Sequence, residues 1–367
     1  MRSERGDSQE DGREALLYRR MKGGRARCLV CQRLCIIPLG GLGYCATRIN
    51  RDGRLYTLIY GRVSTWRVAP AEIKPLFHFY PGSRYLSLGS VGCNFRCPGC
   101  QNWEIAHVQL DAEFREALDR GTTFISPQES VRLARKSGCQ GLSWTYNEPT
   151  LWLEYILEGA KQAKEMGLFT NVVTNGFITS QGLDLLGPFL DAYRVDIKGF
   201  SQDAYRRIAH VKDHAGILEV TERARHKWNM HVEVITNIIP QHNDDERQLT
   251  ALAHWICHRL GQDTPWHITR FIPHRHLSHL PPTPIKNLER VRQLGLDAGL
   301  RFVYLGNVPG HPGENTYCPS CQRTLIERRN YEILTHAIED GHCPTCGEKI
   351  PIVGRYISPH GLGSVGL

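Results

Sequence analysis

The sequence Cys93-Asn-Phe-Arg-Cys97-Pro-Gly-Cys100 places three cysteines in one short loop, directly after the apolar run Tyr85-Leu-Ser-Leu-Gly89. Because each cysteine binds one iron of a [4Fe–4S] cube, three thiolates leave the fourth iron open to a small molecule. An open iron is a place for chemistry, whereas a fully thiolated cluster usually only carries electrons. The alternative is a zinc loop that takes its fourth ligand from elsewhere. The spacing therefore predicts a catalytic cluster on Cys93, Cys97 and Cys100.

The composition is that of a globular protein with a large core, since the 367 residues are 41% hydrophobic and 22% charged. No apolar run approaches the roughly 20 residues that span a bilayer, and residues 1–10 lack the apolar segment of a secretory signal. We therefore expect a cytoplasmic chain with no membrane partner, where grouped cysteines bind metals more often than they form disulfides. The net charge of +8 comes without a long Lys/Arg block, so we expect no nucleic-acid partner.

Two further groups of four cysteines flank the central loop. The first, near the N-terminus, comprises Cys28, Cys31, Cys35 and Cys45. Zinc is the simplest occupant of this group, and a second iron–sulfur cluster is the alternative. The second group forms two C-x-x-C pairs with 21 residues between them: Cys318, Cys321, Cys343 and Cys346. That spacing is typical of a zinc ribbon, and a rubredoxin-like iron site is the alternative. A closed site of four thiolates has no open position for catalysis.

From residue 85 onward, short apolar stretches alternate with amphipathic ones. The expected strands are residues 85–89, 141–146, 169–174, 192–197, 231–237 and 267–272. The expected helices are residues 127–136, 151–166, 180–190, 202–210, 244–260 and 284–298. Repeated strand–helix units predict a parallel sheet with helices outside it, and six units fall short of the eight in a closed barrel. We therefore predict an α/β fold, a partial (β/α)6 TIM-like barrel with a wide mouth and a small Cys-rich metal module at each end of the chain.

The expected domain boundaries follow from the same patterns. Residues 1–27 are charged and glycine-rich and are predicted to be a mobile tail. Residues 28–80 form the N-terminal Cys-rich module, with a strand over 54–60 after an Asp52-Gly53 turn. The barrel then covers residues 81–307, and a zinc-ribbon-like module covers 308–367.

Taken together, these motifs resemble the radical SAM superfamily, and within it the radical SAM protein of the AmmeMemoRadiSam system, a relative of the pyruvate formate-lyase activating enzymes. The resemblance covers residues 28–354. It rests on the three cysteine groups and on four short segments: Tyr146-Asn-Glu-Pro149, Thr174-Asn-Gly176, Asp196-Ile-Lys-Gly199 and Tyr304-Leu-Gly-Asn307. It implies a radical SAM barrel in which S-adenosylmethionine (SAM) takes the open iron through its amino and carboxylate groups.

The resemblance also implies positions for SAM contacts. Glycyl-radical activating enzymes place them beside the third cluster cysteine and in an Asp-x-Lys segment, which correspond here to Gly99, Cys100 and Gln101 and to residues 196–198. The family usually has an aromatic residue where this chain has Gly99. The apolar contact with the adenine region must then come from elsewhere, and Phe95 and Trp103 are the candidates.

The ends of the expected strands carry further candidates for binding SAM. SAM needs carboxylate or carbonyl acceptors for its ammonium, a cation for its carboxylate and polar contacts for its ribose. The residues that supply this set on one rim are Glu148, Asn175, Asp196, Lys198, His267 and Arg270. Any one of them alone is more often a helix cap or a loop hydrogen-bonding group, and their joint placement favours a ligand role. The histidine-rich loop over residues 273–279 is expected to be solvated or to form a lip over the mouth.

The predicted function is that of an oxidoreductase-type radical SAM enzyme similar to the pyruvate formate-lyase activating enzymes. A reduced [4Fe–4S] cluster gives one electron to the sulfonium of SAM, which breaks into methionine and a 5′-deoxyadenosyl radical that takes hydrogen from an unidentified substrate, with a protein as one option. An electron donor such as ferredoxin or flavodoxin is implied. One alternative is a glycyl-radical activating enzyme acting on a partner protein, and another is a non-catalytic iron–sulfur and zinc scaffold.

Overall fold

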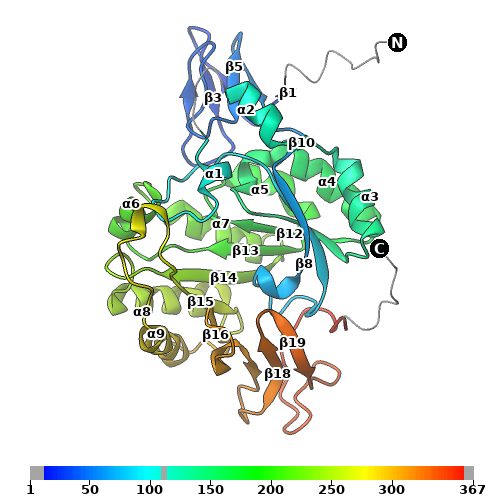
Figure 1. Cartoon of the computed structure of the whole chain (residues 1–367), viewed down its shortest axis with the longest axis vertical. Coiled ribbons are helices and arrows are strands. Elements are labelled where there is room, and N and C mark those ends of the chain that lie inside the picture. The colour runs from blue at the N-terminus through cyan, green and yellow to red at the C-terminus, as the bar shows by residue number, and fades with distance from the viewer. Residues whose placement is uncertain (1–11, 109–113, 359–367) are drawn as a thin grey trace.

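One eight-stranded sheet organises the protein, as the computed structural model shows for residues 12–108 and 114–358 (Figure 1). Its spatial order is β16-β15-β14-β13-β12-β11-β9-β8. The strands are β8 Thr65–Pro70, β9 Arg84–Gly89, β11 Gly141–Trp144, β12 Phe169–Thr174, β13 Ala192–Asp196, β14 His231–Ile238, β15 Trp266–Arg270 and β16 Val303–Gly306. All neighbouring pairs are parallel except β8 with β9. No described strand joins β8 to β16, so the sheet is an open barrel, and this prediction is confirmed.

Helices follow six of the parallel strands and lie outside the sheet (Figure 1). They are α3 Pro127–Lys136, α4 Leu153–Glu165, α5 Ser180–Leu186, α6 Gln202–Ala209, α7 Ala215–His226, α8 Glu246–Trp255 and α9 Ile285–Asp297. In α4 the buried positions Leu153, Ile156, Ala160 and Ala163 recur at helical spacing, which gives the helix one apolar face for the sheet. Among the described residues, no helix has the length and apolar character to cross a bilayer.

The six predicted strand–helix units are confirmed, with boundaries shifted by at most a few residues. The sequence analysis missed β16, whose four residues are too short for a clear pattern, and it missed α7. Two short helices, α1 Trp103–Ala106 and α2 Phe114–Gly121, lie between β9 and α3, where β10 Thr123–Phe124 pairs with β7 Arg62–Val63.

The predicted N-terminal tail is wrong for residues 12–27. There β1 Arg13–Glu14 pairs with β6 Arg54–Thr57, and β2 Tyr18–Arg20 pairs with β3 Ala26–Cys28. The backbone of this segment also forms hydrogen bonds with residues far away in the sequence: the Leu16 N–H donates to a Glu154 carboxylate oxygen at 3.0 Å. The rest of the predicted tail, residues 1–11, lies outside the described residues.

The remaining elements of the N-terminal part are short. Strand β3 also pairs with β4 Ile36–Ile37, and β5 Arg48–Arg51 pairs with β6 across the predicted Asp52-Gly53 turn, where both residues have positive φ (50° and 76°). Strand β8 belongs to the main sheet. The sheet therefore begins before residue 81, where the barrel was predicted to start.

The C-terminal part forms a three-stranded antiparallel sheet of β17 Thr316–Tyr317, β18 Thr324–Arg329 and β19 Glu332–His336. It lies against the lower end of the barrel in Figure 1. Leu325 and Ile326 pack with Phe77, Phe302 and Tyr304 in one buried cluster. A small metal module is thereby fused to the segment that follows β8.

Candidate active site

A cavity of about 550 Å³ lies inside the barrel and reaches the C-terminal ends of its strands. Its size is that of a small-molecule site, and the strand ends are where function resides in barrel folds. Cys93, Cys97 and Cys100 all line it. The structure thus brings the three predicted cluster ligands to one cavity.

The loop that carries these cysteines is held by specific backbone contacts. Gly92 has a φ of +87°, and a Cβ there would lie 2.8 Å from the carbonyl oxygen of Cys45, so only glycine permits this approach. The Asn147 side chain donates to the Gly92 carbonyl at 3.0 Å, and Arg96 donates to that of Cys93 at 2.8 Å. The loop is therefore shaped before any ligand binds.

The spacing of the three sulfurs fits a cluster better than a single zinc ion. One tetrahedral zinc, with Zn–S bonds of about 2.3 Å, holds its sulfurs about 3.8 Å apart, whereas sulfurs bound to different irons of a cube lie farther apart. Among the described residues, the compact group of potential metal ligands is that of the C-terminal cysteines, and the three loop cysteines do not form such a group. Three thiolates that line a cavity without a compact grouping fit a cube with one open iron and disfavour the zinc alternative.

The protonation of these thiols depends on what binds them. Burial raises the pKa of all three, that of Cys97 to about 11 against the opposing charge of Lys198. The Phe95 N–H lies 3.3 Å from the Cys93 sulfur and favours its thiolate. Because a metal-bound thiol is deprotonated, loading the site must release protons.

Glu148 is the most constrained of the predicted SAM contacts. Its side chain is 2% exposed, and it accepts hydrogen bonds from the backbone N–H groups of Thr150 and Asn175, both at 2.9 Å, and from the Thr174 hydroxyl at 2.7 Å. Asn175 in turn donates to the Asn94 side chain at 2.8 Å. Both residues line the cavity, and both fix the cluster loop against the ends of β11 and β12.

Asp196 and Lys198 lie at the end of β13, as predicted, and line the cavity with Arg194. Asp196 forms ion pairs with Arg194 and, at 3.3 Å, with Lys198. Burial alone would raise the pKa of Asp196, but the two cations outweigh it and hold that pKa below its usual value. The carboxylate therefore stays charged and can face a cationic group of a ligand.

The predictions for His267 and Arg270 need correction. His267 lines the cavity, but it is the second residue of β15 and lies inside the barrel, where its Nε2 is 2.6 Å from a Glu233 oxygen. Arg270 does not line the cavity; its Nε donates to the Thr283 carbonyl at 2.9 Å. Because alternate residues of a strand face opposite sides, Thr269 faces the cavity and Arg270 faces away.

The Gly99 position has an apolar neighbour in place of the expected ring. A Cβ on Gly99 would lie 3.0 Å from Leu277 Cδ1, and the His276 N–H donates to the Pro98 carbonyl at 3.2 Å. The histidine-rich loop thus forms the predicted lip over the cluster loop. Of the two aromatic candidates, Phe95 lines the cavity and Trp103 does not. Gly99 and Gln101 both line it, as predicted.

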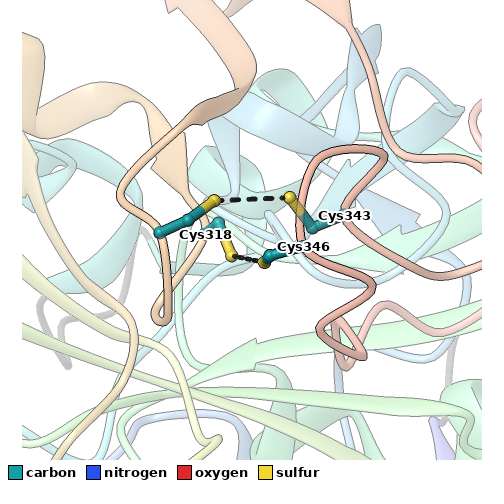
Figure 2. Close-up of side chains that lie close together, drawn as sticks. Cys318, Cys343 and Cys346 are labelled. Atoms are coloured by element: carbon teal, nitrogen blue, oxygen red, sulfur yellow. Dashed lines mark hydrogen bonds between the residues drawn. The ribbon is translucent and has the colours of Figure 1, made fainter.

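The four C-terminal cysteines form a compact site (Figure 2). Their sulfurs all lie within 4.8 Å of one another, with 3.5 Å between Cys318 and Cys346 and 3.6 Å between Cys321 and Cys343. This arrangement fits one tetrahedral metal ion held by four thiolates. The predicted C-terminal metal-binding site is present.

The four N-terminal cysteines share a different setting. All four line one small cavity of about 10 Å³, together with Arg48 and Asn94. Among the described residues, no three of their sulfurs form a group as compact as the C-terminal one. The buried guanidinium of Arg48 is paired with Glu154 at 2.8 Å.

Four cationic residues of the central cavity were missed by the sequence analysis: Arg67, Lys74, Arg194 and Arg328. Two of them come from outside the barrel strands. Lys74 follows β8 and Arg328 belongs to β18, and both line the cavity although neither lies in a barrel strand. No local pattern marks them, because only the tertiary fold brings their segments to the barrel.

The geometry agrees with the known proteins that this chain resembles. The family model for the Radical SAM superfamily matches residues 88–253. Uncharacterized protein MJ0808 of Methanocaldococcus jannaschii is 42% identical over 344 residues, covering 93% of this chain and 99% of that protein. Pyruvate formate-lyase 1-activating enzyme of Escherichia coli K12 is 23% identical over 191 residues, covering 50% of this chain and 69% of that enzyme.

Among solved structures, a domain of the pyruvate-formate lyase-activating enzyme from Bacteroides vulgatus gives a TM-score of 0.40 at 16% identity, covering 46% of this chain and 99% of that chain. The residues matched by the family model include the three-cysteine loop at the end of β9. This chain belongs to the radical SAM superfamily and is homologous to the pyruvate formate-lyase activating enzymes.

Proposed function

We propose that this chain cleaves SAM reductively at a [4Fe–4S] cluster on Cys93, Cys97 and Cys100 and uses the resulting 5′-deoxyadenosyl radical to take a hydrogen atom from a substrate in the central cavity. One observation carries the proposal: of the cysteines in the described residues, only these three line the cavity. When bound, the cluster supplies the electron that breaks the C5′–S bond, and methionine and the radical are the two products. A ferredoxin or flavodoxin is proposed to deliver that electron.

The chain's own residues position the reactants. Glu148 and Asn175 hold the cluster loop against the sheet. Asp196 is proposed to accept from the SAM ammonium and Lys198 to face its carboxylate, while Gly99 and Gln101 contribute contacts from the loop. Leu277 in the lip and Phe95 supply apolar surface beside Gly99. Such positioning matters because an error of about 1 Å in a reacting group costs roughly a hundredfold in rate.

The experiment measures 5′-deoxyadenosine by chromatography after anaerobic reconstitution with iron and sulfide, reduction with dithionite and addition of SAM. We expect Cys97→Ala to abolish the product. The matched control is Cys257→Ala, which removes a thiol outside all three cysteine groups and should retain SAM cleavage. Undiminished 5′-deoxyadenosine from the Cys97→Ala variant would contradict the proposal.

A second candidate is a glycyl-radical activating enzyme, favoured by the homology to the activating enzyme of Escherichia coli over half of this chain. In that case the substrate is a backbone glycine of a partner protein. A SAM-dependent glycyl radical on such a partner, seen by electron paramagnetic resonance, would decide for it. A place in the AmmeMemoRadiSam system and in the cytoplasm stays a prediction.

For the four N-terminal cysteines we propose an iron–sulfur cluster as the occupant. The contrast with the C-terminal site supports this proposal, because the N-terminal cysteines, all of them among the described residues, form no compact metal-ligand group of that kind. The cavity that they line lies beside the catalytic loop, since Arg33 donates to the Asn94 carbonyl at 2.6 Å. Such a cluster would stand on a route for electrons to Cys93.

A further inference from the structure

Arg328 of the C-terminal module enters the barrel cavity as a buried cation. Its side chain is only 3% exposed, yet the residue lines the same cavity as the cluster cysteines. The pairing of β18 with β19 shifts register between Glu327 and Arg328. A bulge of this kind changes the direction in which a side chain points. Here Arg328 is buried, whereas the next residue, Arg329, is exposed.

The guanidinium of Arg328 has no carboxylate in contact within the described part of the chain. Its Nη1 donates to the Thr316 hydroxyl at 2.8 Å and to the Glu314 carbonyl at 3.4 Å, and its Nη2 donates to the Phe77 carbonyl at 3.3 Å. Its buried Nε has no partner. The guanidinium also lies 4.0 Å from the centre of the Phe77 ring, and the buried Glu233 carboxylate acts on it without forming an ion pair. Because a buried cation is costly without a carboxylate in direct contact, this guanidinium can still gain from an anion bound in the cavity.

The two cavity carboxylates whose charge acts on Arg328 are engaged elsewhere. Glu72 accepts from the Gly82 N–H at 3.0 Å, and Glu314 accepts from the Gly310 N–H at 3.1 Å. Burial raises the pKa of both, that of Glu72 to about 7 even though Arg328 opposes the shift. Neither carboxylate forms an ion pair with Arg328 among the described residues, so neither neutralises it by contact.

Lys74 adds a second buried cation to the cavity wall. It is 6% exposed, and its Nζ donates to the hydroxyl of Ser87 on β9, whereas Arg328 lies beside Tyr304 on β16. Burial lowers the pKa of Lys74 to about 7. An anion bound in the cavity would restore its charge. The ion-paired Arg194, whose Nε also has no partner, lines the same cavity.

The hairpin formed by β18 and β19, which carries Arg328, also contacts the barrel at its tip. The hydroxyl of Tyr331, between β18 and β19, donates to the Asn307 side chain at 3.3 Å just beyond the end of β16. Tyr331 and Asn307 both line the cavity. The C-terminal metal module therefore forms part of the cavity wall as well as a separate fold.

We propose that the substrate of this enzyme is a small organic molecule with an oxyanion group, a carboxylate or a phosphate, which Arg328 binds and Lys74 assists. The planar guanidinium makes three hydrogen bonds to the protein, and one Nη2–H remains to donate to such a group as a charge-assisted hydrogen bond. The proposal rests on the proposed function, because the oxyanion site and the cluster face one cavity.

The test is isothermal titration calorimetry of the reconstituted, SAM-loaded protein with two probes, succinate and inorganic phosphate, and with uncharged succinamide as a control ligand. We expect saturable binding of at least one anion and none of succinamide. Arg328→Met should weaken that binding tenfold to a hundredfold, as the loss of one charge-assisted hydrogen bond implies. The probe that binds identifies the oxyanion as carboxylate or phosphate.

Arg329→Met is the matched control, because it removes the neighbouring exposed arginine of the same strand and should leave anion binding unchanged. Arg328→Lys keeps the charge and should bind better than Arg328→Met, which separates charge from folding. The parent protein and Arg329→Met should form 5′-deoxyadenosine, unlike Cys97→Ala, so failure of anion binding in a protein that cleaves SAM is distinguishable from failure of the proposed function. Absence of anion binding to the parent protein, or equal binding by Arg328→Met, would overturn the inference.

Discussion

The catalytic loop and the C-terminal cysteine site use the same ligand atom in two different ways. The loop offers three cysteines that line a cavity and, among the described residues, form no compact group of metal ligands. The C-terminal site offers four sulfurs within 4.8 Å of one another. Four close thiolates complete the coordination of one metal ion, whereas three thiolates on a [4Fe–4S] cluster leave one iron without a cysteine ligand. The number and spacing of cysteines, rather than their presence, separates a site for chemistry from a site for structure.

The N-terminal group extends this comparison because it has four cysteines, like the C-terminal site, but among the described residues they form no compact group, like those of the loop. We expect Cys31→Ala to lower the iron content while zinc stays at about one ion per chain. Cys321→Ser should do the opposite, removing the zinc and leaving the iron, because the two sites share no ligand. Elemental analysis of both reconstituted variants checks this. Loss of zinc rather than iron from Cys31→Ala would show that spacing does not predict the metal.

The buried pair Arg48–Glu154 tests how the N-terminal module is joined to α4. Their side chains are 1% and 2% exposed, so Arg48→Met leaves a buried carboxylate unpaired and should cost about 3–5 kcal/mol of stability. Arg54→Met removes an exposed pair with Glu14 and should cost less than about 1 kcal/mol. Urea denaturation measures both. Equal stability losses in the two variants would mean that the module is not anchored through this pair.

The contribution of the Arg48–Glu154 pair to stability depends on pH, and it is lost on the acid side. Burial alone would raise the pKa of Glu154, but Arg48 outweighs it and holds that pKa below its usual value. The pair therefore stabilises the fold above the unfolded carboxyl pKa of about 4.3. That contribution is lost as pH falls through the lower pKa of the folded state. Stability curves between pH 7 and pH 3 should converge for the parent and Arg48→Met proteins, and a constant difference would contradict this assignment.

The smallest expected effect concerns the contact between the lip and the cluster loop. A side chain on Gly99 meets Leu277 at 3.0 Å, so Gly99→Phe should cost about 1–3 kcal/mol by overpacking. The double variant with Leu277→Ala should recover part of that loss, since it vacates the space that the ring needs. Thermal denaturation of the single and double variants checks the coupling. Additive losses would show that Leu277 does not occupy the position of the missing ring.

Local patterns in the sequence were sufficient for most of the barrel and for the cysteine sites. The strand from 169 to 174 and the helix from 127 to 136 have the predicted bounds. In each case the apolar residues recur with a clear period, and the residues at the two ends mark where the element starts and stops. Arg270 was misplaced because one position along a strand reverses the face. Lys74 and Arg328 could not be predicted, since their burial depends on segments more than 250 residues apart in the chain meeting at one cavity.

The central claim is that the cluster of the three-cysteine loop has an open iron that binds SAM. Electron paramagnetic resonance of the reduced protein tests it most directly, on the Cys31→Ala variant so that the loop cluster alone contributes. Addition of SAM labelled with oxygen-17 in its carboxylate should broaden the cluster signal, because that oxygen binds the iron. A signal that is identical with and without the labelled SAM would contradict the account.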